Sequence, residues 1–184
     1  MVQGHRKNMP LLWLMTDERV SDDALLAAAA RLPKGKGGIV LRHYRTGAKD
    51  RRALFDALTR IARRRRLTLL LGGSVRLAAG WRADGVHGRD NRHSCRPMIR
   101  SGPVHDMREV VAARGVRLDL CFVSPLFPTR SHPGAPVLGR ARFAALARQL
   151  AMPVIALGGV RRQHRRMLEA IGADGWAAID GLTG

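Results

Sequence analysis

Short apolar runs alternate with segments of helical periodicity along almost the whole chain. The apolar runs predict eight strands, at residues 11–15, 38–44, 67–71, 83–88, 97–101, 119–125, 153–159 and 175–182. The segments between them predict helices at residues 22–32, 48–66, 75–81, 105–115, 140–150 and 161–172. Strands that are apolar throughout and separated by helices are typical of a parallel sheet covered on both faces.

Eight such strands predict an α/β fold, a compact TIM (β/α)8 barrel that occupies residues 1–184 as a single domain. A barrel of this kind typically has about 250 residues. The chain has 184, so we expect short helices near strands three to five and no full last helix. An open doubly wound sheet is the alternative architecture.

The composition narrows the class of protein. Hydrophobic residues make up 46% of the chain, and no apolar run approaches the roughly 20 residues that span a bilayer. We therefore expect a cytoplasmic protein that does not contact a membrane. The only two cysteines, Cys95 and Cys121, form neither a disulfide framework nor the spacing of a metal site.

The charge is strongly positive, with 33 Lys and Arg against 14 Asp and Glu and a net charge of +19. Such a surface attracts anions without choosing among phosphate esters, nucleic acids and acidic proteins. Aromatic residues make up only 4%, and no zinc-finger, KH or RNP motif is present, which argues against nucleic acid as the partner. The run Arg63–Arg66 closes a predicted helix, where cations favour the negative end of the dipole.

Two segments that follow predicted strands carry the groups expected of a phosphate site. The segment SPLFPTRSHPGAPVLG (124–139) follows the sixth strand and therefore lies on the functional rim of a barrel. Gly158 and Gly159 follow the seventh strand, where backbone amides and the start of a helix near Arg161 can approach a phosphate. The long segment offers two hydroxyls and two groups that carry charge or a proton: Thr129, Ser131, Arg130 and His132.

Other candidates are scattered over the predicted rim. Arg42 on the second strand is expected to enter the barrel mouth and to need an anion or a carboxylate, and His87 ends the fourth strand. Magnesium is usually held by one or two carboxylates together with substrate phosphates. Asp17, Asp90 and Asp180 lie on the predicted rim, and Asp90 is the candidate metal ligand.

The segments SPLFPTRSHPGAPVLG, PVIALGG, IGADGWAAID and ADGVHG resemble the thiamine phosphate synthases and the related thiazole tautomerases over about residues 11–182. The resemblance implies a compact barrel that uses Mg2+ to join a pyrimidine pyrophosphate to a thiazole phosphate. It implies that Arg42 lies in the pyrophosphate region. It also implies that the thiazole phosphate is bound by two hydroxyls, two glycine amides, one arginine and the backbone near the last strand: Thr129, Ser131, Gly158, Gly159, Arg130 and Ile179. Arg42, His87 and His132 are the predicted catalytic residues.

The chain departs from that family at several functional positions. The family's Gln-Leu-Arg-x-Lys pattern on the second strand reads Val40 to Tyr44 here, and its Asn-Asp pair after the third strand is Gly72 and Gly73. The lysine expected in the long segment is replaced by His132 or compensated by Arg130, and the serine expected after the last strand is replaced by Asp180. The histidine of the tautomerases falls at Pro125.

Four hypotheses follow for the function. The first is a divergent thiamine phosphate synthase. The second is a non-catalytic or repurposed relative that binds a phosphorylated thiazole or another small phosphate ligand. A barrel isomerase with a different substrate and a basic scaffold for nucleic acid are the others. The oligomeric state does not follow from the sequence.

Overall fold

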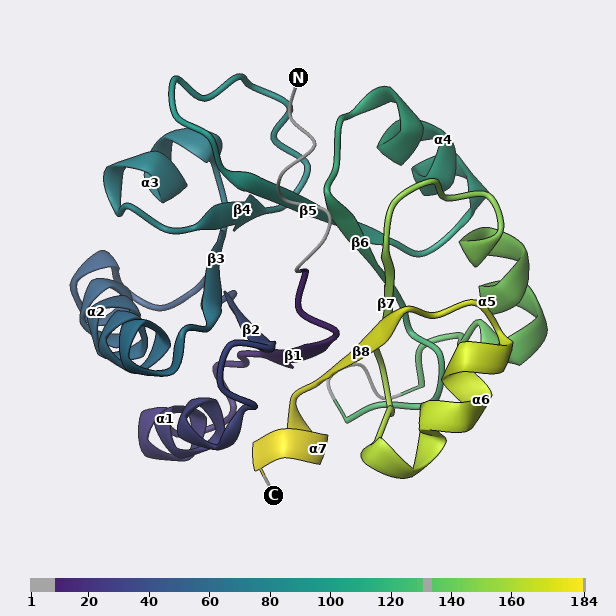
Figure 1. Ribbon diagram of the computed structural model, residues 1–184, viewed down its shortest axis with the longest axis horizontal. Coiled ribbons are helices and arrows are strands. Elements are labelled where there is room, and N and C mark those ends of the chain that lie inside the picture. Colours follow the sequence, from purple (N-terminus) through teal and green to yellow (C-terminus); the bar gives the residue numbers. More distant parts are fainter. Residues whose placement is uncertain (1–8, 131–133, 184) are drawn as a thin grey trace.

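The structure is a computed structural model that describes residues 9–130 and 134–183. Its parallel strands form one closed barrel in the order of the sequence, and the last strand pairs with the first, with Leu12 opposite Trp176. Figure 1 shows this ring of strands enclosed by helices. The strands are β1 (Leu12–Met15), β2 (Gly37–Leu41), β3 (Thr68–Gly72), β4 (Gly85–His87), β5 (Ile99–Val104), β6 (Leu120–Val123), β7 (Val154–Ala156) and β8 (Gly175–Ala178). The predicted barrel is confirmed, and the open sheet is excluded.

The helices are uneven in length, as the short chain requires. They are α1 (Asp22–Arg31), α2 (Ala48–Arg65), α3 (Val75–Gly80), α4 (Met107–Gly115), α5 (Gly139–Ala147), α6 (Arg165–Ala170) and α7 (Asp180–Thr183), with a 3-10 turn η2 (Arg162–His164) before α6. Residues 88–98 join β4 to β5 without a helix, and α7 has only four residues. These features confirm the expected short helices in the middle of the chain, and α7 is the shortest α-helix in the described part of the chain. Within the described ranges, no helix is long and apolar enough to cross a membrane.

Most predicted boundaries move by one residue or more. The last strand ends at Ala178 rather than at residue 182, because the chain from Asp180 onward forms α7, and β7 ends at Ala156 rather than at residue 159. Further shifts concern β2, β5 and the helix after β7. β2 ends at Leu41 rather than at residue 44, because the amide of Arg42 donates to the Thr16 side chain instead of continuing the strand. Arg42 therefore stands just beyond the strand. β5 runs from Ile99 to Val104 rather than over 97–101, because its pairing with β6 continues to Val104 opposite Val123. The helix expected near Arg161 begins as the η2 turn, and α6 starts only at Arg165.

Local signals in the sequence explain where the helices start and stop. The Ser21 side chain accepts the amide of Ala24 at the start of α1, and Asp106 accepts the amide of Glu109 at the start of α4. α2 has three arginines in its last turn and is followed by the capping residue Arg66, whose φ of 53° is left-handed.

The barrel interior is filled by large side chains. Trp13 and Phe122 meet edge to face with ring centroids 5.6 Å apart, and both are almost fully buried. Val40, Leu70 and Ile155 belong to the same cluster. Two further apolar layers lie between the barrel and the helices, one under α1–α3 and one under α4–α6. The interior is therefore solid, and only the ends of the barrel are available for a ligand.

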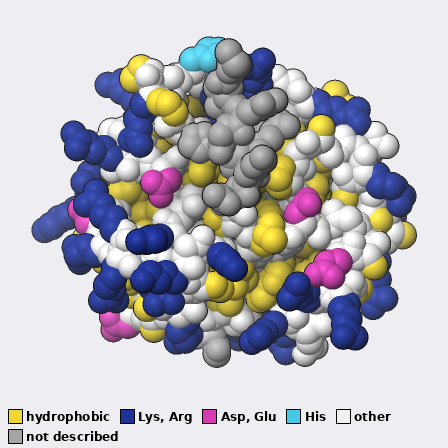
Figure 2. Space-filling view, in the orientation of Figure 1, with side chains coloured by type: hydrophobic (Ala, Val, Ile, Leu, Met, Phe, Trp, Pro, Cys, Tyr) yellow, Lys and Arg dark blue, Asp and Glu magenta, His cyan; other side chains and the backbone are white. Residues whose placement is uncertain are grey.

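Basic side chains are dispersed over the face that Figure 2 shows, with hydrophobic side chains between them, and form no single stripe. This distribution is the one expected of a composition that is rich in arginine throughout. It offers no support for the nucleic-acid scaffold.

We predict that Phe122→Ala lowers the free energy of unfolding by about 3–5 kcal/mol, because it leaves a cavity between Trp13 and His87 that the closed barrel cannot collapse. Urea unfolding at neutral pH measures the loss. Val111→Ala is the control, since Val111 is 63% exposed and its change should stay within about 0.5 kcal/mol. A similar effect at both positions would contradict the packed interior.

Candidate active site

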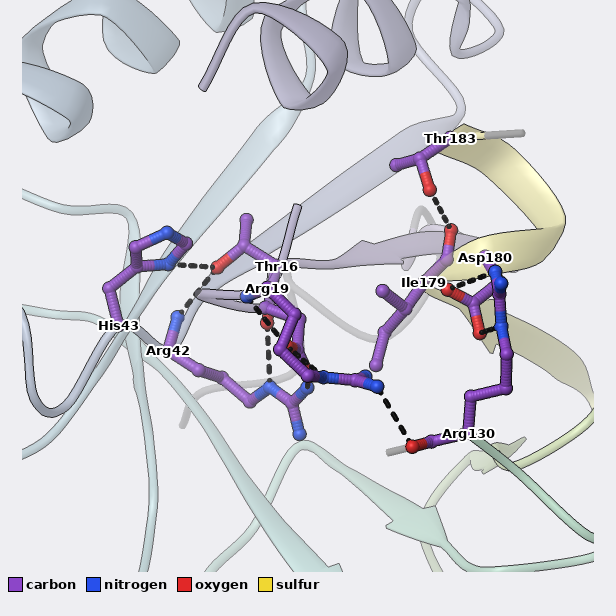
Figure 3. Close-up of polar contacts among 9 residues, drawn as sticks. Thr16, Arg19, Arg42, His43, Arg130, Ile179, Asp180 and Thr183 are labelled. Atoms are coloured by element: carbon purple, nitrogen blue, oxygen red, sulfur yellow. Dashed lines mark hydrogen bonds and ion pairs between the residues drawn. The ribbon is translucent and has the colours of Figure 1, made fainter. Parts of the chain in front are cut away.

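The candidate site lies on the rim formed by the carboxyl ends of the strands. Because all strands are parallel, the segments that follow β1, β2, β6, β7 and β8 emerge at this one end. Figure 3 shows the polar contacts that join four of these segments, those after β1, β2, β6 and β8.

Arg42 is held from two directions by the segment after β1. Its Nε donates to the carbonyl oxygen of Thr16 at 2.9 Å, and its Nη2 lies 3.4 Å from the Asp17 carboxylate. Burial lowers the pKa of Arg42, and the charge of Asp17 opposes that effect. The side chain is 21% exposed, so one part of the guanidinium faces the mouth and remains available to an anion.

Asp17 and Asp180 connect the arginines into a chain across the mouth (Figure 3). Arg19 donates to both oxygens of Asp17, and its Nη1 reaches 2.8 Å to the backbone oxygen of Arg130. Arg130 in turn forms a two-pronged ion pair with Asp180, with distances of 3.1 and 2.9 Å. Burial raises the pKa of Asp17, but hydrogen bonds from Arg19 and the positive charges outweigh it, so its pKa lies below the ordinary value. The Asp17 carboxylate is thus an ionised partner of Arg19 and Arg42.

The segment after β6 packs directly against the Gly158–Gly159 pair. The amide of Phe127 donates to the carbonyl oxygen of Gly158 at 3.1 Å. Gly159 has a φ of 62°, and a Cβ there would lie 2.5 Å from the backbone oxygen of Pro128. Only glycine fits this contact, which brings Thr129 and Arg130 to the side of the glycine pair.

The structure describes only some of the other predicted phosphate ligands. Ser131 and His132 lie outside the described residues. Ile179 follows β8 and is buried, and its carbonyl oxygen accepts the amides of Leu182 and Thr183. Its carbonyl is therefore committed to α7.

His87 lies inside the barrel rather than at its mouth. Its Nδ1 is 3.0 Å from the Ser101 hydroxyl, which donates to the carbonyl of Val86, so the ring nitrogen is the donor to Ser101. Its ring also packs edge to face on Phe122. Burial lowers the pKa of His87 to about 3, so the imidazole is neutral at physiological pH.

Asp90 serves the local backbone. Its two carboxylate oxygens accept the amides of Val75 and Arg92, at 2.9 and 3.1 Å, and these hydrogen bonds lower its pKa. Across the described ranges, no three His, Cys, Asp or Glu side chains come together as a metal site. The residues present therefore do not form a ready site for Mg2+, and Asp90 stays a predicted ligand.

Three residues that our reading of the sequence passed over shape the site: Thr16, Arg19 and Arg51. Thr16 is fully buried, and its hydroxyl accepts the amide of Arg42 and lies 3.0 Å from Nδ1 of His43. The polar run Thr-Asp-Glu-Arg directly after the first apolar strand was the available signal for Thr16 and Arg19. Arg51 lies in a helix that is rich in arginine, and nothing in the pattern distinguishes it.

Comparison with known proteins gives a consistent result. A family model described as thiamine monophosphate synthase matches residues 12–182. The thiamine-phosphate synthase of Geobacillus kaustophilus is 30% identical, with 80% of this chain and 73% of that protein covered. The enzyme of the same name from Syntrophomonas wolfei is 28% identical, with 94% and 88% covered.

A relative of lower sequence identity and a solved structure add detail. The bifunctional thiamine biosynthesis protein ThiED of Geobacter sulfurreducens is 25% identical, and this chain spans 36% of its length. Among solved structures, the thiamine phosphate pyrophosphorylase of Pyrococcus furiosus superposes with a TM-score of 0.79 at 22% identity, with 97% of this chain and 89% of that chain covered. That structure supports the fold.

We predict that His87 makes the protein acid-sensitive. The folded state takes up a proton on His87 only near pH 3, whereas the unfolded state does so near 6.5, so stability should fall as the pH drops through this window. The slope from this one group is at most about 1.4 kcal/mol per pH unit. Urea unfolding at pH 7 and pH 4.5 measures it, and His87→Gln should remove this part of the difference.

His93→Gln is the matched control, because His93 lies on an exposed loop, and it should keep the wild-type difference between the two pH values. If His87→Gln also kept that difference, the placement of a neutral imidazole inside the barrel would be wrong.

Proposed function

Because the chain belongs to the thiamine monophosphate synthase family, we propose that it is a thiamine phosphate synthase, which joins a pyrimidine pyrophosphate to a thiazole phosphate. One observation carries the proposal beyond family membership. The segment after β6 and the Gly158–Gly159 pair meet at the rim through the Phe127–Gly158 hydrogen bond, where a phosphoryl group could be held between them. A cytoplasmic location is part of this proposal.

The thiazole phosphate is proposed to lie against the glycine pair. Amides without side chains in front of them can approach phosphate oxygens closely, and Thr129 adds a hydroxyl from the neighbouring segment. Arg130 is 78% exposed, and its ion pair with Asp180 is of the weak surface kind, so a phosphate can take the place of the carboxylate at modest cost. Ser131 and Ile179 stay in the proposal as predicted ligands.

The pyrimidine pyrophosphate is proposed to face Arg42. In the reaction the carbon–oxygen bond to pyrophosphate breaks, the pyrophosphate leaves with the electron pair, and the thiazole nitrogen forms the new carbon–nitrogen bond with its lone pair. Negative charge therefore grows on the leaving group, beside a guanidinium that Thr16 and Asp17 already hold in place. This preorganised charge is the main catalytic contribution that we assign to the chain.

Proton transfer has a small part in this scheme. The exchange of the carbon–oxygen bond for the carbon–nitrogen bond needs no base at the reacting carbon. The proposal therefore does not require proton transfer by His87, which is neutral and lies inside the barrel. His132 stays a predicted catalytic residue. The family implies Mg2+, but no step is assigned to the ion, because the described residues do not form a site for it.

We predict that the purified protein forms thiamine phosphate and pyrophosphate when it is mixed with both substrates and Mg2+. Arg42→Ala should lower kcat about 100- to 1000-fold, as expected for the loss of one well-placed charge at the leaving group. Product formation followed by chromatography measures both. Wild-type protein that binds thiazole phosphate without turnover would favour a binding protein instead.

We predict that Gly159→Ala raises KM for the thiazole phosphate about tenfold or more, because its Cβ would push the Pro128 carbonyl out of contact and strain a positive φ. Steady-state kinetics with each substrate varied in turn gives the two KM values. Gly134→Ala is the control, since Gly134 also has a positive φ, 74°, but no atom within 4 Å of its Cβ position. Equal effects at both glycines would count against the phosphate site.

A further inference from the structure

Arg51 spans the gap between the ends of two strands at the rim. It lies in the first turn of α2, and its Nη2 donates to the backbone oxygens of Arg42, at 3.2 Å, and Gly72, at 2.5 Å. Arg42 is the first residue after β2, and Gly72 is the last residue of β3. The side chain is therefore fixed at the same end of the barrel as Arg42.

Arg51 differs from the arginines described above in that no carboxylate within residues 9–130 and 134–183 forms an ion pair with it. Arg19, Arg42 and Arg130 each pair with an aspartate. Among the described residues, no carboxylate lies within ion-pair distance of Arg51, and its buried Nε has no hydrogen-bond partner. Burial lowers the pKa of Arg51, the expected direction for a cation without a counterion. A partly buried, unpaired guanidinium at a rim attracts an anion.

Tyr44 stands beside this cation. The Arg51 guanidinium carbon is 5.7 Å from the centroid of the Tyr44 ring, within the range of a cation–π contact. Tyr44 is 59% exposed, which is unusual for a large aromatic residue next to a charge on a rim. The exposed part of the ring is therefore accessible to a ligand that reaches Arg51, while burial raises the pKa of the Tyr44 hydroxyl and keeps it protonated as a donor.

Tyr44 also explains the glycine that ends β3. A Cβ on Gly72 would lie 2.7 Å from the Tyr44 hydroxyl and 3.0 Å from the backbone oxygen of Leu41. The tyrosine thus occupies the volume that a side chain at position 72 would need. The tyrosine at 44 and the glycine at 72, where the resemblance leads us to expect lysine and asparagine, are consequently one packing unit and not two independent losses.

We propose that Arg51 and Tyr44 together bind the diphosphate group of the pyrimidine substrate, with Arg51 supplying the positive charge and Tyr44 a hydroxyl donor and a ring wall. The inference rests on the proposed function for the identity of the substrate. The anion class follows from the site itself, because a planar guanidinium that has no carboxylate partner among the described residues, at the same end of the barrel as Arg42, suits a group with several adjacent phosphoryl oxygens.

The first test is the binding of inorganic pyrophosphate, measured by calorimetry without turnover at fixed ionic strength. Arg51→Gln should weaken binding about 10- to 100-fold, the loss expected for hydrogen bonds to a charged group. Arg51→Lys should recover part of it, and Tyr44→Phe should weaken binding by less. Arg52→Gln is the matched control: it removes the same charge one residue further along α2, from a side chain paired with Asp56, and should change the affinity less than twofold.

Circular dichroism and thermal melts establish that each variant is folded. If Arg51→Gln were unfolded, the exposed Tyr44→Ala change and Arg51→Lys would still report on the site. Folded Arg51→Gln that binds pyrophosphate as tightly as the wild type, or wild type that does not bind it at all, would overturn the inference.

The second test separates this inference from the proposed function. If the wild type forms thiamine phosphate while Arg51→Gln keeps its KM for the pyrimidine pyrophosphate, the site is wrong and the function stands. If pyrophosphate binding depends on Arg51 but no thiamine phosphate forms, the function is wrong and the site stands.

The third test examines the packing unit with a double-mutant cycle. Gly72→Ala should lower the melting temperature in the wild-type background and should do so much less in the Tyr44→Ala background, because the clash with the hydroxyl is gone. Additive effects of the two changes would show that positions 44 and 72 are independent.

Discussion

Closure of the barrel between β8 and β1 is the constraint on which the site depends. The pairing of Leu12 with Trp176 brings residues more than 160 positions apart into one ladder and places Asp180 near the segment that follows β1. The contact of Arg19 with Arg130 and the ion pair of Arg130 with Asp180 exist only because the sheet closes. Without closure the first and last strands would be edges, and the mouth would not be a ring.

Electrostatics at the mouth follow a simple rule. Arg19, Arg42 and Arg130 each form an ion pair with an aspartate, and Arg42 gains a further hydrogen bond to the Thr16 backbone. Arg51 is anchored by backbone oxygens and lies near the rings of Tyr44 and Trp81, and no carboxylate in the described part of the chain forms an ion pair with it. Only a few of the many arginines in the chain therefore contribute defined contacts to the mouth: Arg19, Arg42, Arg51 and Arg130. The dispersed surface charge, by contrast, raises the local concentration of phosphorylated substrates without selecting among them.

Departures from a family pattern are informative when the structure shows what replaced the missing groups. A tyrosine hydroxyl over Gly72 fills the space of a side chain, and a guanidinium from α2 lies where β2 and β3 end. Positive charge is retained at this part of the rim, but it comes from a different element of the fold. No cluster of metal ligands replaces the family's carboxylates among the residues that the structure describes, and both oxygens of Asp90 accept backbone amides.

The sequence alone determined the barrel, the order of its elements, the short last helix and the two rim segments around Thr129 and Gly159, because hydrophobic periodicity and glycine positions are local signals. The sequence also suggested Arg42 as a site residue, although it placed Arg42 within the second strand, and β2 in fact ends at Leu41, one residue before it. The network of Thr16, Arg19 and Asp180 and the position of Arg51 could be decided only by the tertiary structure. These contacts join residues from different strands and helices, and which of the many arginines meets a carboxylate depends on how the ring closes, which no local pattern records.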